Sequence, residues 1–108
     1  MWYSASVLLR GETTGQGSSG TLWTETVFLV RAETEKDAHD KARKLGVQQE
    51  TVHRSVTGRR FDWKFDTILS VFPLFEDTIT DGTTLFSRHL SDTEVQSLKS
   101  TLGDENKP

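Results

Sequence analysis

The chain has 108 residues, of which 33% are hydrophobic, 27% are charged and none is cysteine, and its formal net charge is −3. This length supports one modest core, so we expect a single domain over residues 1–102 and a polar tail over residues 103–108. The absence of cysteine excludes disulfides, thiolate nucleophiles and cysteine-ligated zinc, and no apolar run reaches the length of a membrane span. The chain also opens without a basic segment followed by an apolar block, so we expect a soluble, cytoplasmic protein.

The first third of the chain predicts two strands joined by a hairpin loop. Residues 3–9 alternate apolar and small side chains, which is typical of a strand with one buried face. Residues 11–20 are rich in Gly, Ser and Thr and predict the loop. Residues 22–32 carry apolar side chains on both faces, a pattern typical of a strand in the middle of a sheet with something covering each side.

A helix is predicted over residues 34–46. Thr34 is a suitable N-cap, and Asp37 places a negative charge in the first turn, where backbone amide groups have no partner within the helix. Gly46 indicates a left-handed stop. The apolar stripe is thin and allows the helix to lie close against a sheet; it consists of Ala38, Ala42 and Leu45.

The second half of the chain predicts three more strands and a short helix. Residues 51–56 alternate, and a long strand runs from residue 61 to residue 72, with its apolar face formed by Trp63, Phe65, Leu69 and Val71. Pro73 restricts this strand to an edge or marks a bend. Asp81-Gly82 predicts a turn, and residues 84–90 predict a final strand.

The last predicted element is a short helix that begins with a capping box. Ser91 and Glu94 have the spacing at which each side chain bonds the other residue's backbone amide. Its apolar side consists of Val95, Leu98 and Leu102. The whole order predicts an α+β fold of two layers: an antiparallel sheet of about five strands, one main helix on one face, and a short C-terminal helix.

Several short blocks resemble a small bacterial domain family of unknown function, the 4288 type. The blocks are Trp2-Tyr3-Ser4-Ala5, Val30-Arg31-Ala32 leading into Ala38 and Ala42, the pair Trp63 and Phe65, and Asp81-Gly82-Thr83 followed by Leu85-Phe86-Ser87-Arg88. The resemblance covers roughly residues 1–90. It implies a bacterial or phage origin and a stand-alone domain, and it supplies no catalytic residues.

No residue pattern predicts a cofactor, a metal site or a catalytic residue. Residues 15–20 spell GxGxxG, but they lead into a strand and not into the helix that would receive a pyrophosphate. Glu35 and His39 lie one helical turn apart without a third ligand nearby in sequence. We therefore expect a hairpin loop at residues 15–20 and a solvated helix surface at His39.

Our leading hypothesis is a small, non-enzymatic protein-binding module. Two helices offer too little surface to cover both faces of the sheet, so an apolar and aromatic face remains for a protein partner or a second copy. The residues that we assign to this site are Trp23, Phe72 and Phe75, with an acidic rim of Glu76, Asp77 and Asp81, extended by Asp92 and Glu94. Size and acidity suit an immunity or inhibitor protein that neutralises a toxin.

Two alternatives come from other functional classes. Arginines beside aromatic residues can hold phosphates while bases stack, so a single-stranded nucleic-acid binder would use Arg54, Arg59, Arg60 and Lys64. Against this, residues 31–64 carry a charge of only +3 and residues 65–108 carry −5. A small-molecule binder or small enzyme would instead need a polar cleft near His53, Arg88 and His89.

Overall fold

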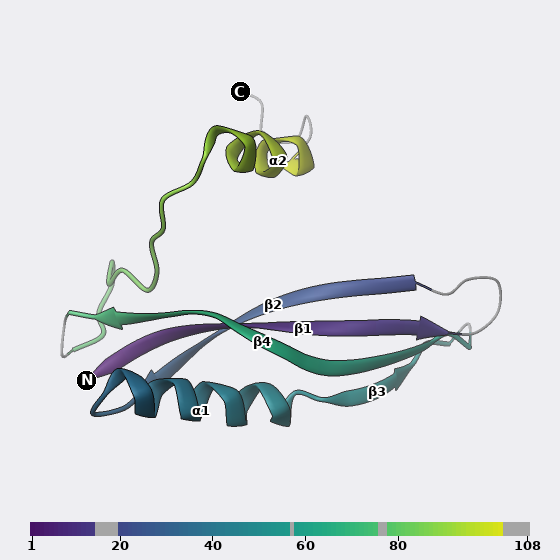
Figure 1. Ribbon diagram of the computed structural model, residues 1–108, viewed down its shortest axis with the longest axis horizontal. Coiled ribbons are helices and arrows are strands. Elements are labelled where there is room, and N and C mark those ends of the chain that lie inside the picture. The colour runs from purple at the N-terminus through teal and green to yellow at the C-terminus, as the bar shows by residue number, and fades with distance from the viewer. Residues whose placement is uncertain (15–19, 57, 76–77, 103–108) are drawn as a thin grey trace.

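The computed structural model describes residues 1–14, 20–56, 58–75 and 78–102 (Figure 1). Its elements are β1 (Trp2–Thr14), β2 (Gly20–Arg31), α1 (Glu35–Gln48), β3 (Thr51–Arg54), β4 (Arg60–Leu74) and α2 (Asp92–Leu102). The strands form a four-stranded antiparallel sheet in the order β2-β1-β4-β3. The predicted α+β class, with the main helix on one face of an antiparallel sheet, is confirmed, and the count of five strands is wrong.

The core lies between α1 and the sheet. On β1, alternate side chains face the helix, and Tyr3, Ala5 and Val7 are all buried. Ala38 and Ala42 on α1 are fully buried, so the small alanine stripe brings the helix axis close to the strands. The thin helix covers one face of the sheet only.

β2 departs from its predicted position. It pairs with β1 along its whole length, beginning at Gly20 and ending where Arg31 lies opposite Trp2, and it forms an edge of the sheet. The predicted hairpin is therefore confirmed, although β1 continues past Gly11 to Thr14 and shortens the loop. The prediction that β2 lies mid-sheet and is covered on both faces is wrong, because apolar residues on both faces do not themselves supply a second covering layer.

Two irregularities in the pairing of β1 with β4 divide the predicted apolar face of the long strand. The register shifts between Ser6 and Val7 and again between Leu8 and Leu9, and the first shift leaves Leu69 out of the pairing. Leu69 is consequently 49% exposed, and Ile68 takes the core position opposite Val7. A strict alternation from residue 61 to residue 72 fails because each bulge changes which face the following residues occupy.

Helix α1 begins as predicted and ends later. The Thr34 hydroxyl accepts a hydrogen bond from the Asp37 backbone amide at 3.1 Å, which is the expected N-cap. Gly46 is not the stop: the helix continues to Gln48, and Gly46 is buried within it. A Cβ at Gly46 would lie 3.2 Å from the Phe65 ring, so this glycine serves close packing of the helix on β4.

The segment after β4 leaves the sheet. Gly82 has φ of +89°, which confirms the predicted turn, but residues 84–90 are not a strand. We name residues 78–91 the arm. It carries α2 to a position where that helix contacts none of the described strands or α1, on the side of the sheet away from α1 (Figure 1). The capping box is confirmed, because Ser91 and Glu94 exchange hydrogen bonds of 3.1 and 3.2 Å.

Candidate functional site

The sheet has one face that α1 does not cover, and we name it the open face. It consists of the even-numbered residues of β1, from Trp2 to Thr14, together with the residues directly opposite them on β2 and β4. Residues directly opposite in an antiparallel pair share a face, so this definition follows from the register alone. The open face combines an apolar half with a basic half.

The apolar half lies along β2 and, on the other side of β1, around Phe72 of β4. Trp23, Val27 and Leu29 are 52%, 50% and 43% exposed. Phe72 is half-buried, because Phe75 and Phe86 each pack edge-on against its ring with centroids 6.3 Å apart. Of the residues predicted for a protein-binding site, Trp23 and Phe72 therefore share this face.

A row of serines forms the floor of the apolar half. Ser4 and Ser6 on β1 are each 1% exposed, and Ser70 on β4 lies opposite Ser6. Ser6 donates a hydrogen bond to the Glu25 carboxylate, whereas the Ser4 and Ser70 hydroxyl oxygens have no partner among the described residues. A buried hydroxyl without a partner costs about 1–3 kcal/mol, so this floor lowers the stability of the sheet at this point.

The basic half lies toward the β1–β2 hairpin. Arg10 stacks over the Trp23 ring at 5.5 Å, and its Nε lies 2.6 Å from the Glu12 carboxylate. Lys64 lies directly opposite Arg10. Arg54 and Arg60 face each other across β3 and β4 and are exposed. The pairing therefore gathers Arg54, Arg60 and Lys64, three of the four residues predicted for nucleic-acid binding, on one face.

Arg59 lies elsewhere, as do Trp63 and Phe65, the aromatic residues next to these cations in the sequence. Arg59 is exposed just before β4, where its carbonyl accepts a 2.8 Å hydrogen bond from the Ser55 amide. Trp63 and Phe65 lie on the α1 side: Trp63 covers Gly11, and Phe65 packs on Gly46 beneath Arg43. The aromatic side chain beside the basic residues is therefore Trp23, which the sequence argument had assigned to protein binding.

The acidic residues of the predicted site lie outside the open face. Asp81 is exposed at the turn in the arm, and Phe75, just past β4, is 82% exposed. Glu76 and Asp77 are outside the described residues. At the start of α2, the backbone and side-chain hydrogen bonds of Ser91 hold the pKa of Glu94 below its ordinary value of 4.5. The acidic charge thus belongs to the arm and α2.

The proposed polar cleft near the histidines does not form. His53 lies on β3, where its ring is 6.4 Å from that of Phe61, at the end of β4 opposite to the one from which the arm departs. Arg88 and His89 lie on the arm, just before α2. None of these three side chains lines the clefts of about 650, 270 and 280 Å³ that the described residues form.

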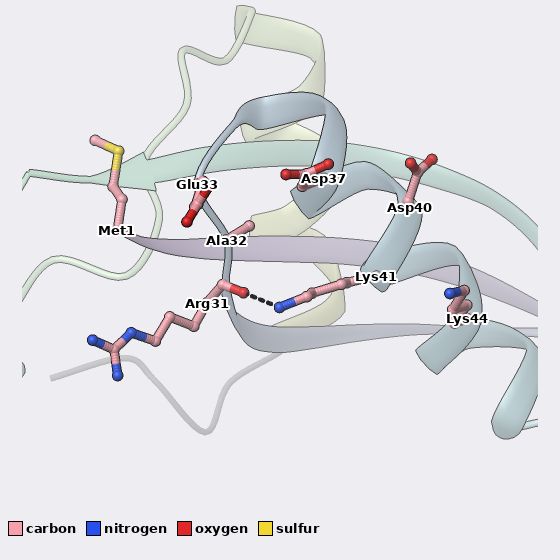
Figure 2. Close-up of a pocket in the computed structure, with 8 residues that line it drawn as sticks. All are labelled: Met1, Arg31, Ala32, Glu33, Asp37, Asp40, Lys41 and Lys44. Atoms are coloured by element: carbon pink, nitrogen blue, oxygen red, sulfur yellow. Dashed lines mark hydrogen bonds between the residues drawn. The ribbon is translucent and has the colours of Figure 1, made fainter.

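One cleft that the sequence did not predict lies where β2 passes into α1 (Figure 2). It has a volume of about 650 Å³. The carboxylates Glu33, Asp37 and Asp40 lie along one side of it, and Arg31, Lys41 and Lys44 lie along the other. Lys41 donates to the Arg31 carbonyl. No cluster of three or more potential metal ligands forms among the described residues, and the cleft holds no nucleophile beside a base.

The features that sequence reasoning missed are the serine floor and Arg10. The alternation of Ser4 and Ser6 with buried neighbours carried the signal, because small polar residues on a central strand imply a face that is not packed like a core. Arg10 could have been found from its register with Trp23 once the hairpin was assigned.

No helix of the described residues is long and apolar enough to cross a membrane.

Residues 2–87 match the family model described as a domain of unknown function, DUF4288. The match covers the sheet, α1 and most of the arm, and it ends before α2. No curated protein and no solved structure matches the chain.

Proposed function

Because the chain belongs to the DUF4288 family, whose description assigns no activity, we propose from its own geometry that it is a protein-binding module acting through the open face. The observation that carries the proposal is that Trp23, Val27 and Leu29 are each about half exposed on one face of β2, where Glu25 lies between Trp23 and Val27. Grouped apolar side chains that a monomer leaves exposed mark interaction surfaces.

The chemistry of the open face suits a protein partner. Tryptophan and arginine are the residues most often found among those that dominate binding energy at interfaces, and here Arg10 stacks on Trp23. Charged side chains lie beside the apolar ones on this face: Glu25, which accepts a hydrogen bond from Ser6, and Arg10 with Lys64 opposite it. An apolar centre with a polar rim is the usual anatomy of an interface.

The test is affinity capture from native lysate at moderate salt with three matched baits: the wild-type chain, Val27→Asp and Val47→Asp. Val27 lies on the open face and Val47 on α1, and their exposures of 50% and 49% are nearly equal. We expect the wild type and Val47→Asp to retain a protein in stoichiometric amount, and Val27→Asp to lose it. The retained protein is either a different protein or an untagged copy of this chain. Equal retention by all three baits would contradict the proposal.

A toxin-neutralising role is the narrower form of this proposal. An immunity or inhibitor protein needs a surface that blocks an effector, and the open face is suited to that task. The acidic residues of the arm and α2, including Asp81 and Glu94, would then meet basic side chains of the effector. Capture of a single effector enzyme by the wild-type bait, with loss of its activity in the complex, would support this form.

A second candidate function is binding of single-stranded nucleic acid. The observation in its favour is that Arg10, Arg54, Arg60 and Lys64 share the open face with the exposed ring of Trp23. Against it, Glu12 and Asp62 lie opposite each other among these cations. Titration of a labelled oligonucleotide over a range of salt decides the question, since phosphate contacts make affinity fall steeply as salt rises.

A further inference from the structure

We infer that the partner of the open face is α2 of a second copy of this chain, so that two copies exchange their C-terminal arms. The inference rests on the proposed function, because it names the occupant of the same face. Each copy would donate one helix and accept one, and the assembly would close as a two-fold dimer. Four observations support it: the state of α2, the course of the arm, the place where the arm begins, and the charges.

α2 is not stable as an isolated element. It has 11 residues, and helices shorter than about 12–15 residues are marginal in water even with favourable sequences. The capping box satisfies amide groups at one end only. Val95 and Leu98 lie on its apolar side, and Leu98 is 46% exposed. Most helical stability in proteins comes from packing of such a side, so α2 needs a surface that its own described chain does not provide.

The course of the arm carries α2 away from its own sheet. No turn or bend interrupts the chain between Thr83 and Ser91, and no glycine or proline lies there to reverse it. Figure 1 shows this segment leaving the sheet and ending in α2 at a distance from the strands. For α2 to reach its own open face the arm would have to fold back on itself. A second copy can place its open face against α2 without any change in the course of the arm.

The arm begins on the open side of the sheet. The contacts of an exchanged α2 would therefore extend the contacts that the arm already makes with this face. Phe86 packs on Phe72, and Thr83 and Thr84 line a hollow of about 270 Å³ with Phe72 and Leu74. Leu74 is 2% exposed as a result. The arm therefore already covers one end of the open face, and an incoming helix would cover the remainder.

The charges of the two surfaces are complementary. The first turn of α2 carries Asp92 and Glu94. The basic half of the open face is net positive, because it carries four cations and two carboxylates: Arg10, Lys64, Arg60 and Arg54, with Glu12 and Asp62. An α-helix of 11 residues spans about 16 Å. With Asp92 over Arg10, Leu98 would lie about 9 Å further along the helix. Val27 lies about 13 Å along β2 from Trp23, so Leu98 would approach Val27.

The experiment uses the absence of cysteine from the chain, which makes introduced thiols unique. Two single-cysteine chains are prepared, Val27→Cys with an added tag and Leu98→Cys without one, and are unfolded and refolded together. A short bis-maleimide reagent then joins thiols that lie close. We expect a cross-linked product with the mass of one tagged and one untagged chain. The control replaces Val27→Cys with Lys36→Cys on the exposed side of α1 and is expected to give none.

A second measurement does not depend on cross-linking. Leu98→Asp places a charge in the middle of the apolar side of α2, and we expect it to raise the dimer dissociation constant in sedimentation by about tenfold or more. Val47→Asp is the matched control and is expected to leave the dimer intact. Circular dichroism of each variant confirms that the sheet and α1 are folded.

Each contrary result has a distinct meaning. A chain carrying both Val27→Cys and Leu98→Cys that closes on itself as a monomer would overturn the exchange, because α2 would then fold back on its own sheet. Another contrary result is that the chains associate and Val27→Asp abolishes the association, yet no cross-link forms between Val27→Cys and Leu98→Cys. That result would also overturn the exchange, and the proposed function would still hold. Association or capture that Val27→Asp leaves unchanged would overturn the proposed function itself.

Discussion

The two faces of the sheet are built from the same strands and differ in what lies against them. On the α1 side, Tyr3, Val7 and Val30 are at most 5% exposed. On the open face, Val27 and Leu29 are just as apolar and remain about half exposed. The difference lies in what covers each face: among the described residues one helix packs on the sheet, and it lies on one side.

The comparison shows why apolar content alone does not locate a core. Burial depends on a second layer, and a helix with an alanine stripe can serve only the face on which it packs. The composition of the open face differs in one respect, since its central strand presents Ser4 and Ser6 where the α1 face presents Ala5 and Val7.

A charge placed on each face should give the largest difference in the free energy of unfolding. Val7→Asp buries an unpaired carboxylate at a fully buried position, and we expect it to lower the free energy of unfolding by about 4 kcal/mol or more, or to prevent folding. Val27→Asp should change it by no more than about 0.5 kcal/mol in the monomer. Urea unfolding of both variants at low protein concentration measures the contrast. A large destabilisation by Val27→Asp would mean that the open face is covered in the monomer.

Two glycines of the β1–β2 hairpin test how closely the α1 side is packed. A Cβ at Gly11 would lie 2.7 Å from the Trp63 ring, whereas at Gly20 its nearest neighbour is the Thr13 hydroxyl at 3.5 Å. We expect Gly11→Ala to lower the free energy of unfolding by about 1–3 kcal/mol, because the ring must move. Gly20→Ala should be neutral or slightly stabilising. Thermal unfolding compares them, and equal midpoints would show that Trp63 moves without cost.

The smallest expected effect is a difference in how the N-terminal caps of the two helices respond to acid. Hydrogen bonds from Ser91 lower the folded pKa of Glu94, so its contribution to α2 is fully present above pH 4.5 and is lost as the pH falls through the folded value. The cap of α1 is the Thr34 hydroxyl, which does not titrate. Amide chemical shifts from pH 6 downward should therefore show loosening at Val95 before any change near Ala38. Simultaneous changes in both helices would contradict this order.

Local chemistry in the sequence was sufficient for the parts of the fold that depend on near neighbours. The Thr34 cap, the capping box at Ser91 and the turn at Gly82 all form as predicted, because each needs residues only a few positions apart. The elements that failed depend on distant partners. Residues 84–90 alternate as a strand does, yet no neighbouring strand receives them, and Gly46 looks like a helix stop until Phe65 is packed against it.

The candidate site divides in the same way. Trp23 and Phe72 are predicted for the protein-binding site, and the sheet pairing brings both to one face, where Trp23 is exposed and Phe72 is half-buried. The same pairing places Arg10 beside Trp23 and Lys64 beside Arg10, and it places Trp63 and Phe65 on the opposite side. Two bulges in the pairing of β4 change the face on which later residues lie, and nothing in the local sequence marks where they occur.

The amino-acid sequence alone specifies a small α+β domain with a capped, alanine-lined helix and more apolar surface than that helix can cover. These properties follow from spacing and composition, which a linear pattern records. Which face α1 covers, where the bulges fall and where the arm carries α2 depend on contacts between residues far apart in the chain. Such contacts exist only once the strands have paired, so the open face is a property of the tertiary structure.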